Sequence, residues 1–465
     1  MEQIKNVKGT QDIIGEDANA FAIVESMLKQ VAEFFTYSEV RPPVLEHSEL
    51  FVRGVGESSD VVRKEMYTFL DKGERSLTLR PEFTAGIMRL LVQNKLYVDR
   101  EMPLKLYYCG PVFRYERPQL GRYRQFNQFG VESVGQQNYL NDAEVIAMAY
   151  TMLVTIGLEN VTLKINSLGD SQSRENYKAA LKDFFKDKIA NMCDDCKSRY
   201  ELNPLRILDC KVPEDQEIVK NAPKMGDYLT EESKEKFSSL CEMLDDMRIP
   251  YEIDDTLVRG LDYYSDCVFE FHYKSVKGND YGAIGAGGHY DKLVKEVGGP
   301  DLPGVGFSFG IERLVNVLKD DGLLPDVSTR LDVYMMPMGA DAQKYCLNLA
   351  NSLRMNGLYV DMCFDNAKMS AQFKRAEKKH AKIAVIVGDN EIENGTVVIK
   401  NLTTTEQETV PVEAMLEKVS DILESFEHDD ECCCCGGHHE HGEECSCGEH
   451  HDDEHECCCK DKKGK

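Results

Sequence analysis

The sequence predicts two folded units: an α+β domain built on an antiparallel sheet and split by a helical insertion, followed by a smaller α/β domain. Three observations predict this division. Short apolar runs broken by Gly and Pro fill residues from about 40 to 135, as is typical of antiparallel strands. A Lys- and Asp-rich helical stretch at about 170–250 interrupts that pattern. Beyond residue 330 strands alternate with helices, which is typical of a largely parallel sheet.

Length and composition exclude several classes of protein. The chain has 465 residues, of which 42% are hydrophobic and 29% charged, and a chain about three times the length of a typical domain forms two or three folding units. No apolar run approaches the roughly 20 residues of a membrane-spanning helix. The amino terminus is polar where a secretory signal would be apolar. We therefore expect a cytoplasmic protein with no membrane partner.

Acidic residues and cysteines are concentrated at the carboxyl terminus. The net charge is −26, and residues 427–465 hold 13 acidic residues against four lysines. The same segment contains nine of the 17 cysteines, interleaved with seven histidines. Such a composition cannot bury a core and predicts a disordered acidic tail. The other eight cysteines are scattered, which favours reduced thiols over a disulfide framework.

The first domain, expected over residues 1–325, begins with a helix. Its apolar residues recur at spacings of three and four and so share one face; they are Phe21, Val24, Leu28, Val31 and Phe35. Strands are predicted in SLTLRPEF and in LKLYYCGPVFRYERPQLGRYRQFNQFGVESVG. A second helix at 142–156 ends at Gly157, and the strand VTLKI follows.

The strand pattern resumes after the insertion. DTLVRGLDYYSDCVFEFHY, YGAIGAGGHYD and LPGVGFSFG continue the interrupted sheet, and a helix is expected from near Ile311. Turn-forming residues cluster at 322–330 and mark a domain boundary. The α/β domain is expected over residues 330–426, with strands at LDVYMMPM, LYVDMCF and IAVIV around a basic helix.

The hairpin at 106–134 brings an arginine, an amide and a carboxylate together around glycine. Because side chains alternate along a strand, Gln128, Gly130 and Glu132 share one face, and Gly110 shares a face with Arg114 on the paired strand. Glycine among polar side chains lets a ligand approach the backbone. The pattern predicts the polar floor of a pocket, with a solvated sheet face as the alternative.

Six segments, in order along the chain, resemble the motifs of one enzyme family. FRYERPQLGRYRQFNQFGVE is similar to motif 2 of the class II aminoacyl-tRNA synthetases, RPPVLEHSELF to motif 1 and GVGFSFGIERL to motif 3. LVRGLDYYSDCVFEF resembles the peptide peculiar to histidyl-tRNA synthetases, and KGTQD and LRPEFTA resemble their amino-terminal elements. The resemblance covers residues 1 to about 425. It implies a class II catalytic domain, a carboxyl-terminal anticodon-binding domain and a homodimer.

The resemblance implies that the chain activates L-histidine with ATP and Mg²⁺ and transfers it to the 3′ end of tRNA(His). The carboxylate of histidine attacks the α-phosphorus of ATP, so catalysis depends on alignment and on cancelling negative charge. The resemblance assigns catalytic roles to Arg259 and Arg114. It assigns ATP binding to Arg114, Arg122 and Arg313. A surface ion pair is the alternative for each arginine.

Selection of histidine requires polar groups that fit an imidazole. By the same resemblance, Glu132 accepts a hydrogen bond from one ring nitrogen and Tyr264 completes the pair. The other contacts to histidine are assigned to Glu82, Phe83, Thr84, Arg114, Gln128, Arg259 and Tyr263. The chain departs from the family pattern at Phe83, His289 and Lys292, where glycine, arginine and glycine are usual.

In the α/β domain a group of basic residues predicts contacts with tRNA phosphates near the anticodon. A solvated helix face with ion pairs is the alternative. The group comprises Lys374, Arg375, Lys378, Lys379 and Lys382.

No metal site is expected in the body of the chain. Cys193, Cys196 and Cys210 offer three thiols and Cys241 a fourth, but their spacing is not that of a zinc ribbon, so free structural thiols are favoured. Thiols and imidazoles crowd the tail and predict binding of Zn²⁺, Ni²⁺ or Cu⁺ there. The candidate tail ligands are Cys432, Cys433, Cys434, Cys435, Cys445, Cys447, His438 and His439.

Two other functions compete with a histidine–tRNA ligase. The catalytically silent regulatory subunit of ATP phosphoribosyltransferase resembles the catalytic body but typically lacks the anticodon-binding domain. This chain keeps both that domain and the LVRGLDYY peptide. A metal-buffering protein would account for the tail but not for the pocket. The ligase is therefore the favoured prediction.

Overall fold

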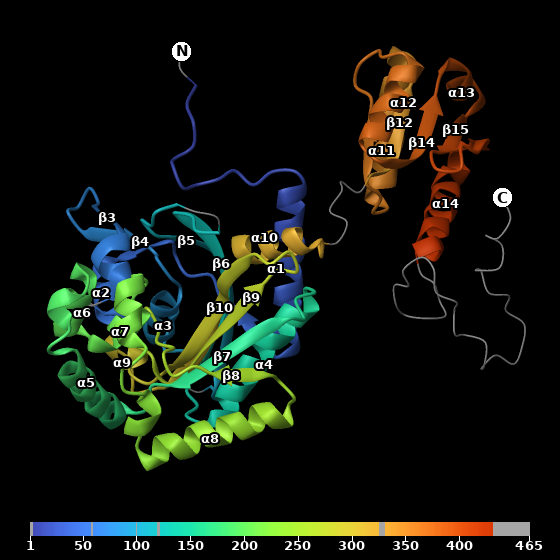
Figure 1. Ribbon diagram of the computed structural model, residues 1–465. Coiled ribbons are helices and arrows are strands. Elements are labelled where there is room, and N and C mark those ends of the chain that lie inside the picture. Colours follow the sequence, from blue (N-terminus) through green and yellow to red (C-terminus); the bar gives the residue numbers. More distant parts are fainter. Residues whose placement is uncertain (1–2, 57–58, 99, 119–120, 325–330, 431–465) are drawn as a thin grey trace, which may run out of the picture. The chain divides into compact units, whose positions relative to one another are not determined.

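An eight-stranded sheet forms the centre of the first of two units (Figure 1), which comprise residues 1–327 and 328–465. The computed structural model describes residues 3–56, 59–98, 100–118, 121–324 and 331–430. Within these ranges every helix is too short or too polar to cross a bilayer. Residues 431–465 and all candidate metal ligands of the tail, Cys432 to Cys435, Cys445, Cys447, His438 and His439, lie outside the described residues.

The strands of the large sheet are mostly antiparallel. Their order is β1-β5-β6-β11-β10-β9-β7-β8, and only the outermost pairs at the two edges, β1 with β5 and β7 with β8, are parallel. The two strands of the predicted hairpin at 106–134 pair directly, and Leu106 stands opposite Glu132. The strands are β1 Ser38–Glu39, β5 Leu104–Phe113, β6 Gln125–Val134, β11 Gly304–Gly310, β10 Asp280–Tyr290, β9 Ser265–Lys274, β7 Val161–Ser167 and β8 Tyr251–Ile253.

Helices α1 (Glu16–Phe34), α4 (Tyr139–Thr155) and α10 (Ile311–Asp321) pack with the sheet around the largest core. The predicted apolar face of α1 is confirmed, because Val24, Leu28 and Val31 are buried. Helix α1 contacts both α4 and α10. Burying such faces is the main contribution to stability in a domain of this kind.

A smaller sheet and four helical elements stand at one side of the unit. Strands β2 (Leu45–His47), β4 (Ser76–Leu79) and β3 (Tyr67–Leu70) form the sheet. Nearby are α2 Ser48–Val55, the π-helix η1 Val61–Glu65, α3 Thr84–Gln93 and α9 Leu293–Glu296.

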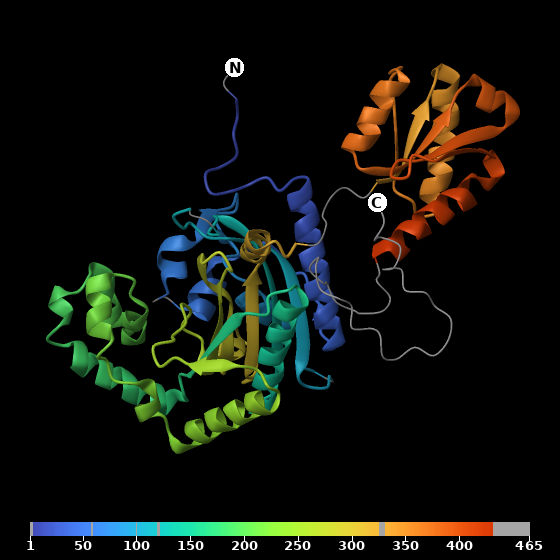
Figure 2. The ribbon, with the colours of Figure 1, turned by 45° about the vertical axis from the view of Figure 1, so that its right-hand side comes forward.

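The stretch between β7 and β8 forms a helical lobe with its own core, followed by a helix that returns to the sheet. Figure 2 shows the lobe as a group of green helices beside the sheet. Helix α8 (Glu231–Asp246) packs on α4 instead and belongs to the main core. The lobe consists of α5 Ser171–Phe185, η2 Ile189–Asn191, α6 Asp194–Leu202, η3 Pro204–Asp209, α7 Pro213–Val219 and η4 Met225–Tyr228.

The second unit is an α/β domain, as predicted. Its sheet has the order β13-β12-β14-β15-β16, in which the first three strands are parallel and the last two antiparallel. The strands are β12 Leu331–Pro337, β13 Val360–Met362, β14 Ala381–Val387, β15 Thr396–Asn401 and β16 Gln407–Pro411. The helices are α11 Ala340–Met355, α12 Met369–Lys378, α13 Asp389–Asn394 and α14 Met415–Asp430, with η5 Val412–Ala414 before the last.

Candidate active site

A buried carboxylate, Glu132 of β6, lies at the centre of the candidate site. Its Oε2 accepts a hydrogen bond of 2.7 Å from the hydroxyl of Tyr290, and its Oε1 accepts one of 2.7 Å from Thr84 and one of 3.4 Å from Tyr108. Burial raises the pKa of Glu132 to about 8. Because a carboxylate offers about four acceptor positions, one remains for a ligand.

A second buried carboxylate, Glu82, fixes the start of α3. Its two oxygens accept hydrogen bonds from the backbone N–H groups of Thr84 and Ala85, at 2.7 and 2.9 Å. This is the arrangement that stabilises a helix amino terminus. Burial raises the pKa of Glu82. The neighbouring Phe83 is 2% exposed and stacks on Tyr108, with ring centres 4.2 Å apart.

Gln128 and Arg114 lie at the other end of the β5–β6 hairpin. Gln128 is buried and its amide nitrogen lies 3.5 Å from the hydroxyl of Ser308. Arg114 donates to the backbone oxygen of Pro81 at 2.9 Å. Since Gln128 and Glu132 are both buried, the solvated sheet face considered as an alternative is excluded.

Arg259 carries a fixed positive charge beside Tyr263 and Tyr264. It forms an ion pair with Glu270, and both side chains are largely buried, at 17% and 16% exposed. Burial alone would lower the pKa of Arg259, but its electrostatic interactions with Tyr264 and Glu270 outweigh that effect and raise the pKa. Among the described residues, its buried Nε has no hydrogen-bond partner. That N–H is available to a ligand.

Tyr263 and Tyr264 close the cluster around Glu132. Their ring centres are 4.5 Å apart, and the ring of Tyr263 lies 5.7 Å from that of Tyr290. Burial raises the pKa of both hydroxyls. The guanidinium of Arg259 lies 5.5 Å from the centre of the Tyr264 ring. Tyr264 therefore stands between the cationic and the acidic parts of the site.

Two more arginines lie close together beyond Arg114. Arg313, at the start of α10, donates to the backbone oxygens of Ala283 and Gly121. Burial lowers the pKa of Arg313, and the charge of Arg122 lowers it further. Two cations that repel one another in this way favour a bound polyanion. Arg122 forms an ion pair with Glu116 at 3.4 Å. A surface ion pair was the alternative to ATP binding for this arginine.

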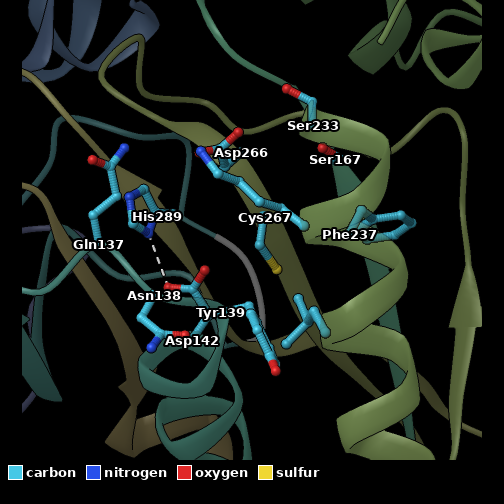
Figure 3. Close-up of a pocket in the computed structure, with 12 residues that line it drawn as sticks. Gln137, Asn138, Tyr139, Asp142, Ser167, Ser233, Phe237, Asp266, Cys267 and His289 are labelled. Atoms are coloured by element: carbon cyan, nitrogen blue, oxygen red, sulfur yellow. Dashed lines mark hydrogen bonds and ion pairs between the residues drawn. The ribbon is translucent and has the colours of Figure 1, made fainter. Parts of the chain in front are cut away.

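Tyr108 and Tyr290 were not predicted from the sequence as partners of Glu132, and His289 was expected only as a departure from the family pattern. Figure 3 shows His289 pointing toward Asp142 of α4 beside a cavity of about 30 Å³. Its Nδ1 lies 2.9 Å from Asp142 and its Nε2 3.2 Å from Asp291. Burial would lower the pKa of His289, but these carboxylates raise it to about 10. His289 is thus an anchored cation next to Tyr290.

A second cavity, of about 240 Å³, opens between α5 and the peptide that carries Arg259. Its wall includes Tyr263 and Asp262 from that peptide and Arg174 from α5. Lys292, the other departure noted in this region, also lines it and donates to Ser171 at 3.2 Å. The helical lobe therefore lies next to the candidate site, with this cavity between α5 and the peptide that carries Arg259.

Comparisons with known proteins agree on both units. A family model described as histidyl-tRNA synthetase matches residues 9–314, and one described as anticodon binding domain matches residues 332–422. The histidine–tRNA ligase of Staphylococcus aureus strain JH9 is 46% identical over 417 residues, which are 89% of this chain and 99% of that protein. The alignment with this ligase therefore includes the anticodon-binding region that the regulatory subunit typically lacks.

Two solved structures show the same architecture. The crystal structure of apo S. aureus histidyl-tRNA synthetase matches with a TM-score of 0.77 and 39% identity, over 90% of this chain and all of that one. An ATP phosphoribosyltransferase regulatory subunit/histidyl-tRNA synthetase from Bacillus halodurans C matches with a TM-score of 0.59 and 21% identity, over 83% of this chain and 98% of that one. At that identity the second match concerns the fold alone.

Proposed function

The chain belongs to the histidyl-tRNA synthetase family and is a histidine–tRNA ligase, and we propose that Glu132, Arg114 and Arg259 carry its chemistry. Aminoacyl-tRNA synthetases use ATP and Mg²⁺, and the partners of this family are histidine, ATP and tRNA. The observation that supports the assignment best is the buried carboxylate of Glu132, held by Thr84 and Tyr290.

In the first step the carboxylate of histidine attacks the α-phosphorus of ATP and pyrophosphate leaves. Arg259 and Arg114 would face the reacting phosphate, where preorganised donors stabilise the charge that develops in the transition state. Arg122 and Arg313 would bind the rest of the nucleotide. No protein nucleophile is required, so activity should depend on cations rather than on a thiol or hydroxyl. In the second step the activated histidine is transferred to the 3′ end of tRNA(His).

Mg²⁺, when bound, neutralises phosphate charge. In nucleotide sites it is held by one or two carboxylates together with phosphate oxygens. The backbone oxygen of Glu65 accepts a hydrogen bond of 2.7 Å from the N–H of Tyr115, which brings Glu65 beside Glu116, and Glu116 is paired with Arg122 at 3.4 Å. We propose that these two carboxylates would hold the ion.

For the amino acid, Glu132 and Tyr264 would select the imidazole. An amino acid that cannot donate to Glu132 would leave a buried carboxyl group without its ligand partner, which is unfavourable. The charged α-amino group fits Glu82, Thr84 and Gln128. Phe83 and Tyr263 complete the walls of the pocket.

The second unit would hold the anticodon arm of tRNA through α12. Arg375 and Lys379 are paired with Asp365 and Asp361. These two residues therefore fit the alternative of a solvated helix face with ion pairs. Lys374 and Lys378 are exposed and have no ion pair among the described residues. These two lysines are the better candidates for phosphate contacts.

A homodimer in the cytoplasm is the expected assembly and compartment. The small sheet exposes apolar side chains on one face, where Leu45 and Phe69 are 48% and 45% exposed, and Leu45 lies in the segment that resembles motif 1. An exposed apolar patch of this kind fits a second copy of the chain. For the tail, its crowded thiols and imidazoles support binding of Zn²⁺, Ni²⁺ or Cu⁺.

Histidine-dependent exchange of labelled pyrophosphate into ATP by the purified chain tests this function. The ligase should catalyse exchange with histidine and not with other amino acids, and it should then charge tRNA(His). A folded chain that binds histidine without exchange would favour the regulatory alternative.

A further inference from the structure

Outside the active site, the helical lobe gathers four side chains of the types that bind metal ions. One ligand atom from each of Cys193, Cys196, Cys210 and Asp215 lies within 4.8 Å of the other three. Cys193 caps α6 and Cys196 lies in its first turn, Cys210 follows η3, and Asp215 lies in the first turn of α7. Three short helical elements thus converge on one point.

The distances fit a tetrahedral zinc ion. Zn–S bonds of about 2.3 Å at tetrahedral angles place two sulfurs about 3.8 Å apart, and the sulfurs of Cys193 and Cys210 are 3.8 Å apart. With a Zn–O bond of about 2.0 Å, a sulfur and an oxygen lie about 3.5 Å apart. The Cys210 sulfur and Asp215 Oδ2 are 3.2 Å apart. A small movement of the carboxylate would complete the site.

The electrostatics of the cluster also favour a cation. Asp215 is 2% exposed, and no Lys or Arg forms an ion pair with it in the described part of the chain. A buried carboxylate is costly unless it is paired or coordinates a metal. Backbone N–H groups point at two of the sulfurs, from Cys196 to Cys193 at 3.4 Å and from Val212 to Cys210 at 3.5 Å. Such outer contacts orient metal-binding side chains.

We propose that Cys193, Cys196, Cys210 and Asp215 form a structural Zn²⁺ site that holds the helical lobe together. Because the protein fills all four positions, the site has the closed character of structural rather than catalytic zinc. This proposal differs from the sequence-based expectation of free structural thiols. Cys241, the fourth thiol considered from sequence, lies instead on α8 and packs against the main core.

The core of the lobe is small, so a metal site would add to its stability. Its own core consists of eleven buried residues, two of which are Cys196 and Cys210 themselves. Small folding units bury too little apolar surface to be stable alone and often rely on a metal. Zinc binding would supply folding free energy directly, because the site does not exist in the unfolded chain.

The zinc site would also stabilise the active site. Between Cys196 and Cys210 lie Arg199 and Arg206, which both pair with Asp60, at 2.8 and 3.0 Å. In the same interval Asn203 donates to Asp262 at 3.0 Å. Asp262 belongs to the peptide that carries Arg259, so loss of zinc should loosen that peptide.

The test must separate this site from the tail. The full-length chain with its nine tail cysteines changed to Ser and the seven histidines of residues 427–465 changed to Ala is loaded with Zn²⁺, dialysed, and analysed for metal content and for free thiols. We expect Cys210→Ser, made in that background, to lose one zinc equivalent per chain, and Asp215→Asn to hold the ion more weakly and so to lose part of it on dialysis. Cys346→Ser, a buried cysteine of α11 in the other unit, is the matched control and should lose none.

Co²⁺ in place of Zn²⁺ reports the ligands without any assay of activity. The tail-substituted chain should show the absorption of tetrahedral Co²⁺ with thiolate charge-transfer bands, and Cys210→Ser should abolish it. Asp215→Asn keeps the size of the side chain, so it should change the spectrum while far-ultraviolet circular dichroism stays the same. The proposal is overturned if the tail-substituted chain holds no zinc, if Cys210→Ser retains all of it, or if Cys193 and Cys210 are recovered as a disulfide that excludes zinc.

Discussion

The hydroxyl of Tyr290, on β10, donates a hydrogen bond of 2.7 Å to Oε2 of Glu132, on β6. Strand β11 lies between these two strands in the sheet. Tyr290 can reach across it because β11 carries Gly304 and Gly306 at the crossing point. A Cβ at Gly306 would lie 2.1 Å from Glu132 Oε2, and one at Gly304 would lie 2.4 Å from the Tyr290 ring. The glycines of motif 3 thus make room for the group assigned to the imidazole.

Glu132→Gln should weaken histidine recognition and leave ATP binding alone. A hydrogen bond to a charged group contributes about 1.5–3 kcal/mol, so the KM for histidine should rise roughly 10- to 150-fold. Pyrophosphate exchange at varied histidine and varied ATP separates the two constants. An equal rise in the KM for ATP would contradict the assignment of Glu132 to histidine alone.

Histidine binding near pH 7 should release a proton from Glu132. Burial raises the pKa of Glu132 to about 8, so the free site is mostly protonated below that pH, whereas a carboxylate that accepts from the ring N–H must be ionised. Histidine affinity should therefore increase with pH up to about 8 and then level off. Titration calorimetry in two buffers of different ionisation enthalpy measures the number of protons released on binding. Equal heats in both buffers would rule out the release, and Glu132→Gln should abolish it.

Gly306→Ala should distort the histidine pocket although it replaces no charged residue. The added methyl group overlaps Glu132 and the backbone oxygen of Val131, which lies 2.4 Å from the Cβ position, so Glu132 must move. We expect at least a tenfold rise in the KM for histidine. Gly226→Ala is the control, because a Cβ there has nothing within 4 Å. Similar kinetics of the two variants would show that β11 does not shape the pocket.

Arg259→Ala should lower the rate of adenylation while the protein remains folded. Removing one preorganised donor to a transition state typically costs about 10²–10³ in kcat. Single-turnover formation of histidyl-adenylate, with circular dichroism as the check on folding, measures this. Arg53→Ala removes an exposed arginine from a surface ion pair and should have no effect. An unchanged rate in Arg259→Ala would remove this residue from the mechanism.

Phe69→Asp should separate the proposed dimer. Phe69 is 45% exposed on the same face of the small sheet as Leu45, and a carboxylate placed in an apolar interface carries a desolvation cost of several kcal/mol. Light scattering after size exclusion should change from the mass of a dimer to that of a monomer. Met355→Asp, at an 82% exposed position of the second unit, should leave the mass unchanged. A dimer that survives Phe69→Asp would place the interface elsewhere.

Local patterns in the sequence were sufficient for much of this fold. The apolar face of α1 and the shared face of Gln128 and Glu132 follow from helix and strand periodicity, and both are confirmed. The contact between Tyr290 and Glu132 could not be predicted in this way, because it depends on which strand lies between two others. The same holds for Asp215, which joins the cysteine cluster only through the packing of α7 on η3. Motifs identified the enzyme, but tertiary contacts decide which neighbours each residue has.

One cleft should hold an imidazole against Glu132 and a phosphate against Arg114 and Arg259. A crystal structure of the chain with a non-hydrolysable histidyl-adenylate analogue is the test of this arrangement. We expect a ring nitrogen about 3 Å from a carboxylate oxygen of Glu132, with both guanidinium groups on the phosphate of the same ligand. A ligand whose ring lies away from Glu132, or whose phosphate contacts neither arginine, would contradict it.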